Sequence, residues 1–189
     1  TRWTTSAAVK AITAVAFVGF ASQAMAADVT WDRLLNAQND DANWMMYHKD
    51  FTGHHHSGLK QINTRNVKNL KLAWQHNPAA TKRGIQGFPL AVDGMVYYTT
   101  TSGTIWALNG ATGKPVWHHA AKIDVERAEG TFYNPYNRGL AIGHGNVYMG
   151  TTDGRLIALN AKSGEVVWDN EIMSVARVIK ASQVLQLSS

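Results

Sequence analysis

Three consecutive histidines, His54, His55 and His56, are the residues of this sequence that first suggest chemistry, since imidazole is a common metal ligand. Successive side chains of an extended segment point to opposite faces, so three adjacent histidines cannot converge on one ion. His54 and His56 share a face, but a metal site needs at least one more ligand. We therefore predict no metal site here, and we interpret His118 and His119 as loop residues for the same reason.

The composition is that of an ordered domain without a strong charge bias. The chain has 189 residues, of which 45% are hydrophobic, and a formal net charge of +5. Arg2 and Lys10 supply two of the positive charges, and no cluster of Lys and Arg forms a stripe. We therefore expect no nucleic-acid partner. The absence of cysteine excludes disulfides, thiolate metal sites and cysteine nucleophiles.

Residues 1–27 have the pattern of a secretory signal. A positively charged start is followed by the apolar run AITAVAFVGFA, which ends in the small residues SQAMAA. The run is too short to span a bilayer, so we expect no stable membrane span. Cleavage near Ala26 or Ala27 would place the mature chain outside the cytoplasm. The alternative is an N-terminal helix or a retained anchor. Because the sequence opens with Thr1, we also expect its N-terminus to be incomplete.

The clearest organising feature is an internal repeat. Residues 94–117 (GMVYYTTTSGTIWALNGATGKPVW) align without a gap with residues 145–168 (GNVYMGTTDGRLIALNAKSGEVVW), 51 positions later. Before the repeat, we expect a short helix around Trp31 to Ala37. The alternation in LKLAWQH, residues 70–76, predicts a half-buried strand.

Each repeat predicts a small antiparallel unit. Two β-prone runs are separated by Ser-Gly or Asp-Gly, and a second glycine turn leads to a short strand that ends in tryptophan. With a fourth strand from the linking sequence, the unit is a blade of a β-propeller. Trp117 and Trp168 are expected to pack between blades, with Trp74 as a third residue of this kind. The alternatives are a two-repeat sandwich and a duplicated hairpin.

A propeller needs at least four blades to close, whereas this chain holds about two to three. The fold class is therefore predicted as all-β, a partial β-propeller. We expect the chain to be a fragment, although oligomerisation through open blade edges is the alternative.

The motifs ALNGATGKPVW and ALNAKSGEVVW resemble the tryptophan-docking motif of dehydrogenases that use pyrroloquinoline quinone (PQQ). Asn109 and Asn160 stand where Asp is usual, and either side chain can hydrogen-bond the turn backbone. The stretches NWMMYHKDFTGHHHSGLKQIN, GIQGFPLAVDGMVYYTT and NPYNRGLAIGHGNVYMGTTDGRLIALN are similar to quinoprotein alcohol dehydrogenases. The resemblance covers about residues 32–172 and implies part of an eight-bladed propeller.

The resemblance divides the chain into a signal at 1–27, the N-terminal part of a PQQ-dependent dehydrogenase propeller at 28–172, and a tail at 173–189. The tail no longer resembles the family, and a frameshift or a premature end of the gene would produce it.

The family resemblance implies an enzyme that oxidises primary alcohols to aldehydes in the periplasm. Its cofactors are PQQ and Ca²⁺ or a lanthanide ion, and its electrons pass to a quinone or to cytochrome c. This chain by itself is expected to be inactive. A second interpretation is a non-catalytic PQQ-repeat propeller scaffold of the outer-membrane assembly type. A third, a soluble carbohydrate-binding module, has no specific support.

The resemblance also assigns site residues. Arg138, in NPYNRGLA, matches an arginine that contacts the cofactor, and a guanidinium suits its carboxylates and quinone oxygens. Gln86, in GIQGFP, stands where many relatives have a cofactor-contacting Glu; a polar turn residue is the alternative. Phe132 and Tyr133 occupy the places of a cysteine pair found in many relatives. The catalytic Asp, the cation ligands and the stacking Trp lie in later blades, so we predict no catalytic and no metal-binding residue here.

Overall fold

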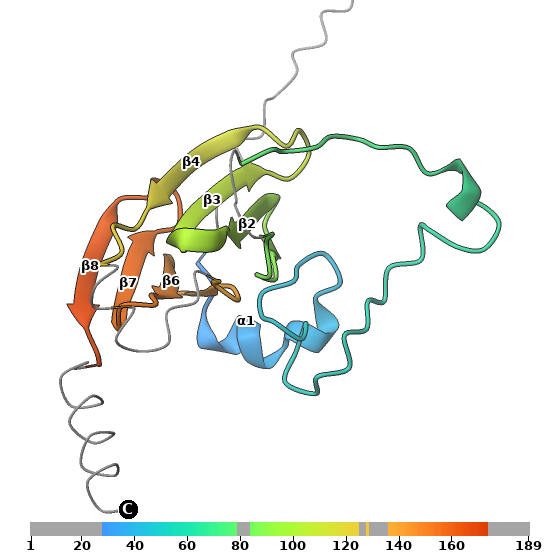
Figure 1. Cartoon of the computed structure of the whole chain (residues 1–189). Coiled ribbons are helices and arrows are strands. Elements are labelled where there is room, and N and C mark those ends of the chain that lie inside the picture. Colours follow the sequence, from blue (N-terminus) through green and yellow to red (C-terminus); the bar gives the residue numbers. More distant parts are fainter. Residues whose placement is uncertain (1–27, 79–83, 125–127, 129–135, 174–189) are drawn as a thin grey trace, which may run out of the picture.

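Two four-stranded antiparallel sheets lie side by side in this computed structural model, which describes residues 28–78, 84–124, 128 and 136–173 (Figure 1). The first sheet has the order β1-β2-β3-β4 and contains β1 (Leu90–Val92), β2 (Met95–Thr99), β3 (Thr104–Asn109) and β4 (Pro115–Ala120). The second has the order β5-β6-β7-β8 and contains β5 (Ala141–Gly143), β6 (Asn146–Gly150), β7 (Arg155–Asn160) and β8 (Val166–Glu171). The all-β prediction with two repeated units is confirmed, and the linking sequence supplies β1 and β5.

The turns between β3 and β4, and between β7 and β8, form for the reason that the sequence suggested. The Asn109 carboxamide oxygen accepts hydrogen bonds from the backbone N–H groups of Ala111 (3.1 Å) and Thr112 (3.0 Å). Asn160 does the same for Lys162 (2.9 Å) and Ser163 (3.1 Å). Each asparagine therefore satisfies backbone donors that the turn would otherwise leave unpaired.

The main hydrophobic core lies between the two sheets. Trp117 of β4 is 9% exposed, and its indole Nε1 donates a 3.0 Å hydrogen bond to the carbonyl of Ala161, just after β7. The ring covers Gly164, where a Cβ would lie only 2.6 Å from it. The expectation that Trp117 packs between the repeated units is confirmed. Other residues that fill this core are Tyr97, Ile105, Ala107, Val147, Met149, Ile157 and Leu159.

Trp74 and Trp168 are the other two tryptophans that the sequence predicts to pack between blades. Trp74 donates a 2.9 Å hydrogen bond to the Gly110 carbonyl and covers Gly113. Trp74 therefore occupies, relative to the first sheet, the place that Trp117 occupies relative to the second. Trp168 is half-buried, with its ring centroid 5.9 Å from that of Tyr148 on the face turned away from the first sheet.

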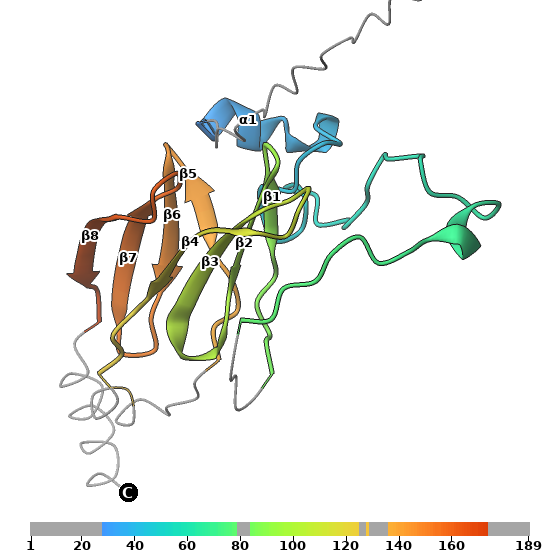
Figure 2. The ribbon, with the colours of Figure 1, turned by 90° about the horizontal axis from the view of Figure 1, so that it is seen from above.

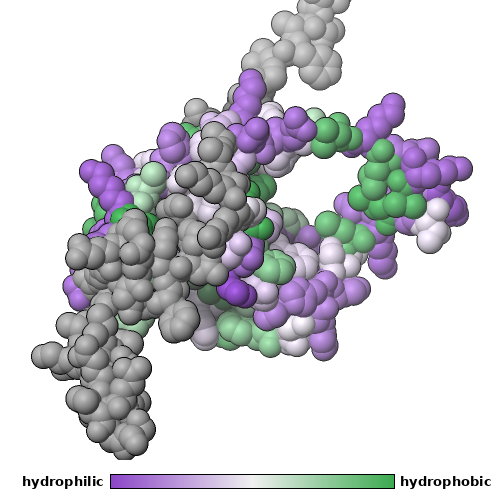
Figure 3. All heavy atoms as spheres, viewed as in Figure 1, coloured by the Kyte–Doolittle hydropathy of each residue, from purple (hydrophilic) through white to green (hydrophobic). Residues whose placement is uncertain are grey.

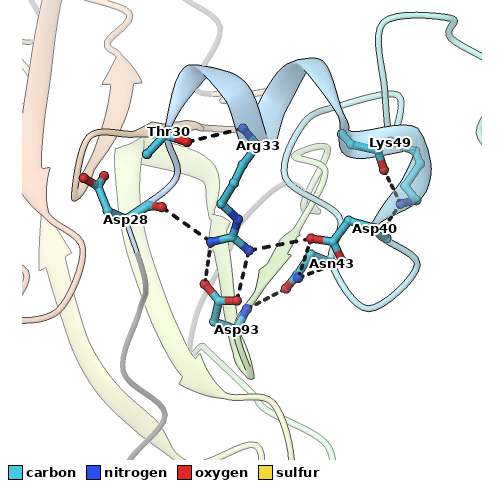
Figure 4. A network of polar contacts seen from close by, with 8 residues as sticks. Asp28, Thr30, Arg33, Asp40, Asn43, Lys49 and Asp93 are labelled. Atoms are coloured by element: carbon cyan, nitrogen blue, oxygen red, sulfur yellow. Dashed lines mark hydrogen bonds and ion pairs between the residues drawn. The ribbon is translucent and has the colours of Figure 1, made fainter.

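The N-terminal segment joins the two sheets at one end. Helix α1 (Trp31–Leu35) confirms the predicted helix, and Figure 2 shows it across the strand ends. Its Arg33 holds both carboxylate oxygens of Asp93, in the β1–β2 turn, at 3.0 Å (Figure 4). The Val29 carbonyl accepts a 3.0 Å hydrogen bond from the His144 N–H, in the β5–β6 turn. One short segment thus contacts an equivalent turn in each repeat.

The segment continues through the 3-10 helix Ala37–Asn39 and contains a buried lysine. The Lys49 ammonium donates to the backbone carbonyls of Ala37 (2.8 Å) and Asp40 (Figure 4). These two carbonyls compensate for the removal of the ammonium group from water. Farther along, Trp44 forms an isolated antiparallel bridge to Ala91 of β1, which pairs the free edge of that strand.

Two local predictions were wrong. Residues 70–76 form no strand, because no described segment pairs with their backbone. They complete an arm that includes the 3-10 helix Val67–Asn69, extends from the body and returns to it where Trp74 contacts the first sheet. His118 and His119 are not loop residues, since β4 continues through them to Ala120, paired with β3. Figure 3 shows apolar surface on the arm, where Leu72 is 78% exposed.

Several predictions fall outside the described residues: the signal at 1–27, the Phe132 and Tyr133 substitutions, and residues 174–189 of the tail. Within the described ranges, no helix has the length and apolar character needed to cross a membrane.

Candidate functional site

The segments that carry Gln86 and Arg138 meet where β1 and β5, the first strands of the two sheets, begin. Phe88, just before β1, forms a parallel bridge with Gly139, just before β5, and the Phe88 N–H donates a 3.3 Å hydrogen bond to the Arg138 carbonyl. Gly139 has φ +137, a conformation that side chains disfavour, and a Cβ there would lie 3.4 Å from the Phe88 carbonyl oxygen. Glycine after Arg138 therefore permits the backbone conformation in which the two segments pair.

A hollow of about 320 Å³ opens at this junction. Its walls come from three parts of the chain: the N-terminal segment, the start of β1, and the approach to β5 with the end of β6. Tyr47 and Phe88 face each other there, with ring centroids 4.1 Å apart. The lining residues are Tyr47, Phe88, Leu90, Asn137, Arg138, Gly139, Leu140 and Gly150.

Arg138 is the cation of the hollow. Its side chain is exposed and makes no ion pair or hydrogen bond with the residues that the structure describes. The guanidinium can therefore bind a carboxylate or a quinone oxygen through two parallel hydrogen bonds. This position agrees with the prediction that Arg138 contacts a cofactor, which no contact in the structure tests.

Gln86 lies beside the hollow but does not line it. Its side chain is exposed, two residues before Phe88. Next to it, a Cβ on Gly87 would lie 2.6 Å from the Thr99 hydroxyl and 3.4 Å from the Asn137 carbonyl oxygen. The backbone after Gln86 thus packs against the segment that carries Arg138, which brings the two predicted residues to the same end of the sheets.

Tyr47 and Phe88 line the hollow and were missed by the sequence analysis, as was Thr99, which lies next to Gly87 behind it. Thr99 is fully buried, and its hydroxyl has no hydrogen-bond partner among the described residues. The identical motif positions could not indicate it, since Thr99 aligns with Gly150 in the second repeat. Tyr47 and Phe88 lie outside the repeated units, so no periodicity marks them.

The run of three histidines contacts the segment that precedes it. The His55 ring meets His48, with His48 Nδ1 2.5 Å from His55 Nε2, and the pair lies beside Tyr47. Over the described ranges, no group of three or more His, Asp or Glu side chains is arranged to hold a metal ion.

A second polar cluster lies at the same end of the second sheet. Asp153 is almost fully buried and accepts a 2.9 Å hydrogen bond from the Asp124 N–H and a 3.1 Å bond from Arg155 Nε. Burial opposes ionisation of Asp153, but hydrogen bonds from Thr151 and Asp124 and the charge of Arg155 outweigh it and lower the pKa of the carboxyl. Arg155 also donates a 2.6 Å hydrogen bond to the Lys122 carbonyl.

These residues fit a flat, acidic ligand such as PQQ. Arg138 offers a positive charge that has no anionic partner among the described residues, and Tyr47 and Phe88 offer aromatic surface.

Comparisons with known proteins identify the family of the chain. The model of the glucose/ethanol/alcohol dehydrogenase β-propeller domain matches residues 44–170. The dehydrogenase subunit of an alcohol dehydrogenase (quinone) from Gluconacetobacter polyoxogenes is 41% identical over 160 residues, which cover 83% of this chain and 22% of that protein. The chain thus spans about a fifth of the length of this curated relative.

Solved structures give the same result. A quinohemoprotein alcohol dehydrogenase from Pseudomonas putida superposes with a TM-score of 0.73 and 33% identity, covering 78% of this chain and 21% of that one. A europium-containing methanol dehydrogenase gives a TM-score of 0.69 and 30% identity, covering 76% and 25%. The repeated sheets and these matches together show that the chain belongs to the PQQ-dependent alcohol dehydrogenase family.

Proposed function

We propose that this chain forms one wall of the cofactor site in a PQQ-dependent enzyme that oxidises primary alcohols to aldehydes. The observation that carries the proposal is the contact between the segments that lead into β1 and β5. There the Phe88–Gly139 bridge places Arg138 at a hollow, with Gln86 beside it. Arg138 has no anionic partner among the described residues, and an acidic cofactor would supply one.

Each residue of the wall has a physical task in this proposal. When bound, PQQ supplies the quinone that accepts the hydride equivalent of the alcohol. Arg138 holds acidic oxygens of the cofactor, and Gln86 exchanges a hydrogen bond with it. Tyr47 and Phe88 remove water from one side of the hollow, which strengthens the polar contacts. The catalytic carboxylate and the cation ligands belong to other blades, so we propose that this chain alone has no turnover.

The remaining assignments are proposals that rest on the relatives and on the sequence. A europium-containing relative supports Ca²⁺ or a lanthanide as the companion ion of the cofactor. The alcohol dehydrogenase (quinone) and the 1-butanol dehydrogenase (cytochrome c) among the relatives support a quinone or cytochrome c as electron acceptor. The pattern of residues 1–27 supports a periplasmic location and a mature chain that begins near Asp28.

PQQ titration tests the proposal. We expect PQQ to bind the chain and to quench its tryptophan fluorescence, and we expect Arg138→Ala to weaken the affinity about tenfold, the effect of losing one charge-assisted contact. Arg65→Ala is the matched control, because Arg65 is an exposed arginine on the arm. Gln86→Ala should weaken binding less than Arg138→Ala, since its contact involves no charge.

The titration also distinguishes the proposed cofactor role from the competing function. If neither PQQ nor PQQ with Ca²⁺ changes the fluorescence or the melting temperature, the cofactor role is wrong and a non-catalytic propeller scaffold becomes the better interpretation. Equal loss of affinity in Arg138→Ala and Arg65→Ala would show that PQQ binds through non-specific charge.

A further inference from the structure

The residue before Arg138 uses both ends of its side chain on backbone groups. The Asn137 carboxamide nitrogen donates a 2.9 Å hydrogen bond to the carbonyl of Gly150, at the end of β6. Its carboxamide oxygen accepts a 3.0 Å hydrogen bond from the N–H of Gly139, just past Arg138. One side chain thus ties the backbone after Arg138 to the end of β6 in the second sheet.

Arg138 itself is held only through its backbone. Its carbonyl accepts the 3.3 Å hydrogen bond from the Phe88 N–H, whereas its side chain contacts no polar group among the described residues. The direction in which the guanidinium leaves the backbone therefore depends on the Phe88 contact and on the two hydrogen bonds of Asn137.

We infer that Asn137 is a positioning residue, which fixes the backbone around Arg138 so that the guanidinium faces the hollow. A long arginine side chain loses rotamer freedom when it binds a ligand, and a fixed backbone prevents further loss. Asparagine suits the task because one carboxamide donates to the Gly150 carbonyl and accepts from the Gly139 N–H at once. The inference rests on the proposed function for its consequence, which is tighter binding of an acidic cofactor.

Neither alanine nor aspartate at position 137 can form both hydrogen bonds of Asn137. Alanine removes both hydrogen bonds. Aspartate still accepts from the Gly139 N–H but cannot donate to the Gly150 carbonyl, and it places a negative charge next to Arg138. Both Asn137→Ala and Asn137→Asp should therefore loosen the segment, and the aspartate should in addition compete with an acidic ligand for the guanidinium.

The first experiment measures positioning without the cofactor. In Asn137→Ala, we expect hydrogen exchange at the Gly139 and Phe88 amides to accelerate about tenfold, the effect of roughly 1.4 kcal/mol of local stability. Asn43→Ala is the matched control: the Asn43 carboxamide oxygen accepts a 2.7 Å hydrogen bond from the Asp93 N–H, at the opposite ends of the strands. The control should accelerate exchange at Asp93 and leave the Gly139 and Phe88 amides unchanged.

The second experiment measures the consequence for PQQ. Asn137→Ala should weaken PQQ binding three- to tenfold and reduce the induced circular dichroism of the bound cofactor, whereas Asn43→Ala should change neither. Asn137→Asp should weaken binding further than Asn137→Ala.

The two readouts keep the inference separate from the proposed function. Unchanged exchange at Gly139 and Phe88 in Asn137→Ala overturns the positioning role, whatever PQQ does. Accelerated exchange with unaltered PQQ affinity overturns the link between positioning and binding. If the unmodified chain shows no affinity for PQQ, the proposed function fails, while the exchange measurement still decides whether Asn137 positions Arg138.

Discussion

The indole N–H of Trp117 and the hydroxyl of Tyr97 donate to the same acceptor, the backbone carbonyl of Ala161, at 3.0 and 3.1 Å. Both donors belong to the first sheet and the acceptor to the second, so one carbonyl oxygen joins the two repeated units. Because a carbonyl has two lone pairs, it satisfies both buried donors at once. The contact between the sheets is therefore specific as well as apolar.

A methyl group placed under the Trp117 ring should weaken this contact. Gly164 and Gly145 both have φ +73, but only at Gly164 would a Cβ meet the ring, at 2.6 Å; at Gly145 it would meet nothing within 4 Å. Gly145→Ala costs only the left-handed conformation, about 1–2 kcal/mol. Gly164→Ala should cost about 1–3 kcal/mol more, because the ring must move. Urea unfolding of both variants measures the difference, and equal losses would contradict the packing.

Removal of the Tyr97 hydroxyl should reduce stability in a pH-dependent way. Burial of Tyr97 raises the pKa of its phenol to about 12 from 10.0. A raised pKa contributes stability that is present below pH 10 and is lost as the pH rises from 10 toward 12. Tyr97→Phe should cost about 1 kcal/mol at pH 7, since the Ala161 carbonyl keeps its bond from Trp117.

The difference in the free energy of unfolding between Tyr97→Phe and the unmodified chain should become smaller as the pH rises above 10, and urea unfolding between pH 7 and 12 measures it. Tyr148→Phe serves as the control, because Tyr148 occupies the equivalent position in the second repeat but faces away from the first sheet. A Tyr148→Phe variant with the same alkaline profile would contradict the assignment to Tyr97.

The contact between α1 and the β1–β2 turn should be measurable as a coupling energy. Arg33 donates two 3.0 Å hydrogen bonds to Asp93, and these bonds are the main cause of the raised pKa of Arg33. A double-mutant cycle of Arg33→Gln and Asp93→Asn should give about 1 kcal/mol, less at high salt. The cycle of Arg33→Gln with Asp40→Asn, a pair 3.6 Å apart, should give a smaller value.

Replacement of the buried Asp153 should change how the free energy of unfolding depends on pH in the acid range. The pKa of Asp153 is lowered from 3.8, so its carboxylate contributes stability that is present above pH 3.8 and is lost as the pH falls through the lowered pKa. Asp153→Asn should cost about 1–3 kcal/mol at pH 7 and progressively less below pH 3.8. Urea unfolding from pH 2 to 7 checks this result. Asp32→Asn, an exposed control on α1, should change the profile little.

Local features were predicted well because they depend on residues near one another in the chain. The Asn109 and Asn160 turns, the repeated strands and α1 follow from side chains that bond their own backbone neighbours and from alternating polarity. His118 and His119 were placed wrongly, since a strand end depends on its pairing partner, and β3 continues opposite them to Thr104.

The sequence alone determined the repeated unit, the role of Trp117 and the family, because these are written in turn chemistry, in spacing and in motif residues. Only the tertiary structure decided that the Gln86 and Arg138 segments meet at one hollow. It also decided that Thr99 lies buried beside them and that Asn137 ties their backbone to Gly150. These contacts join residues far apart in the chain. Polarity patterns specify which face of a strand is buried, whereas the partner of that face depends on how the sheets pack.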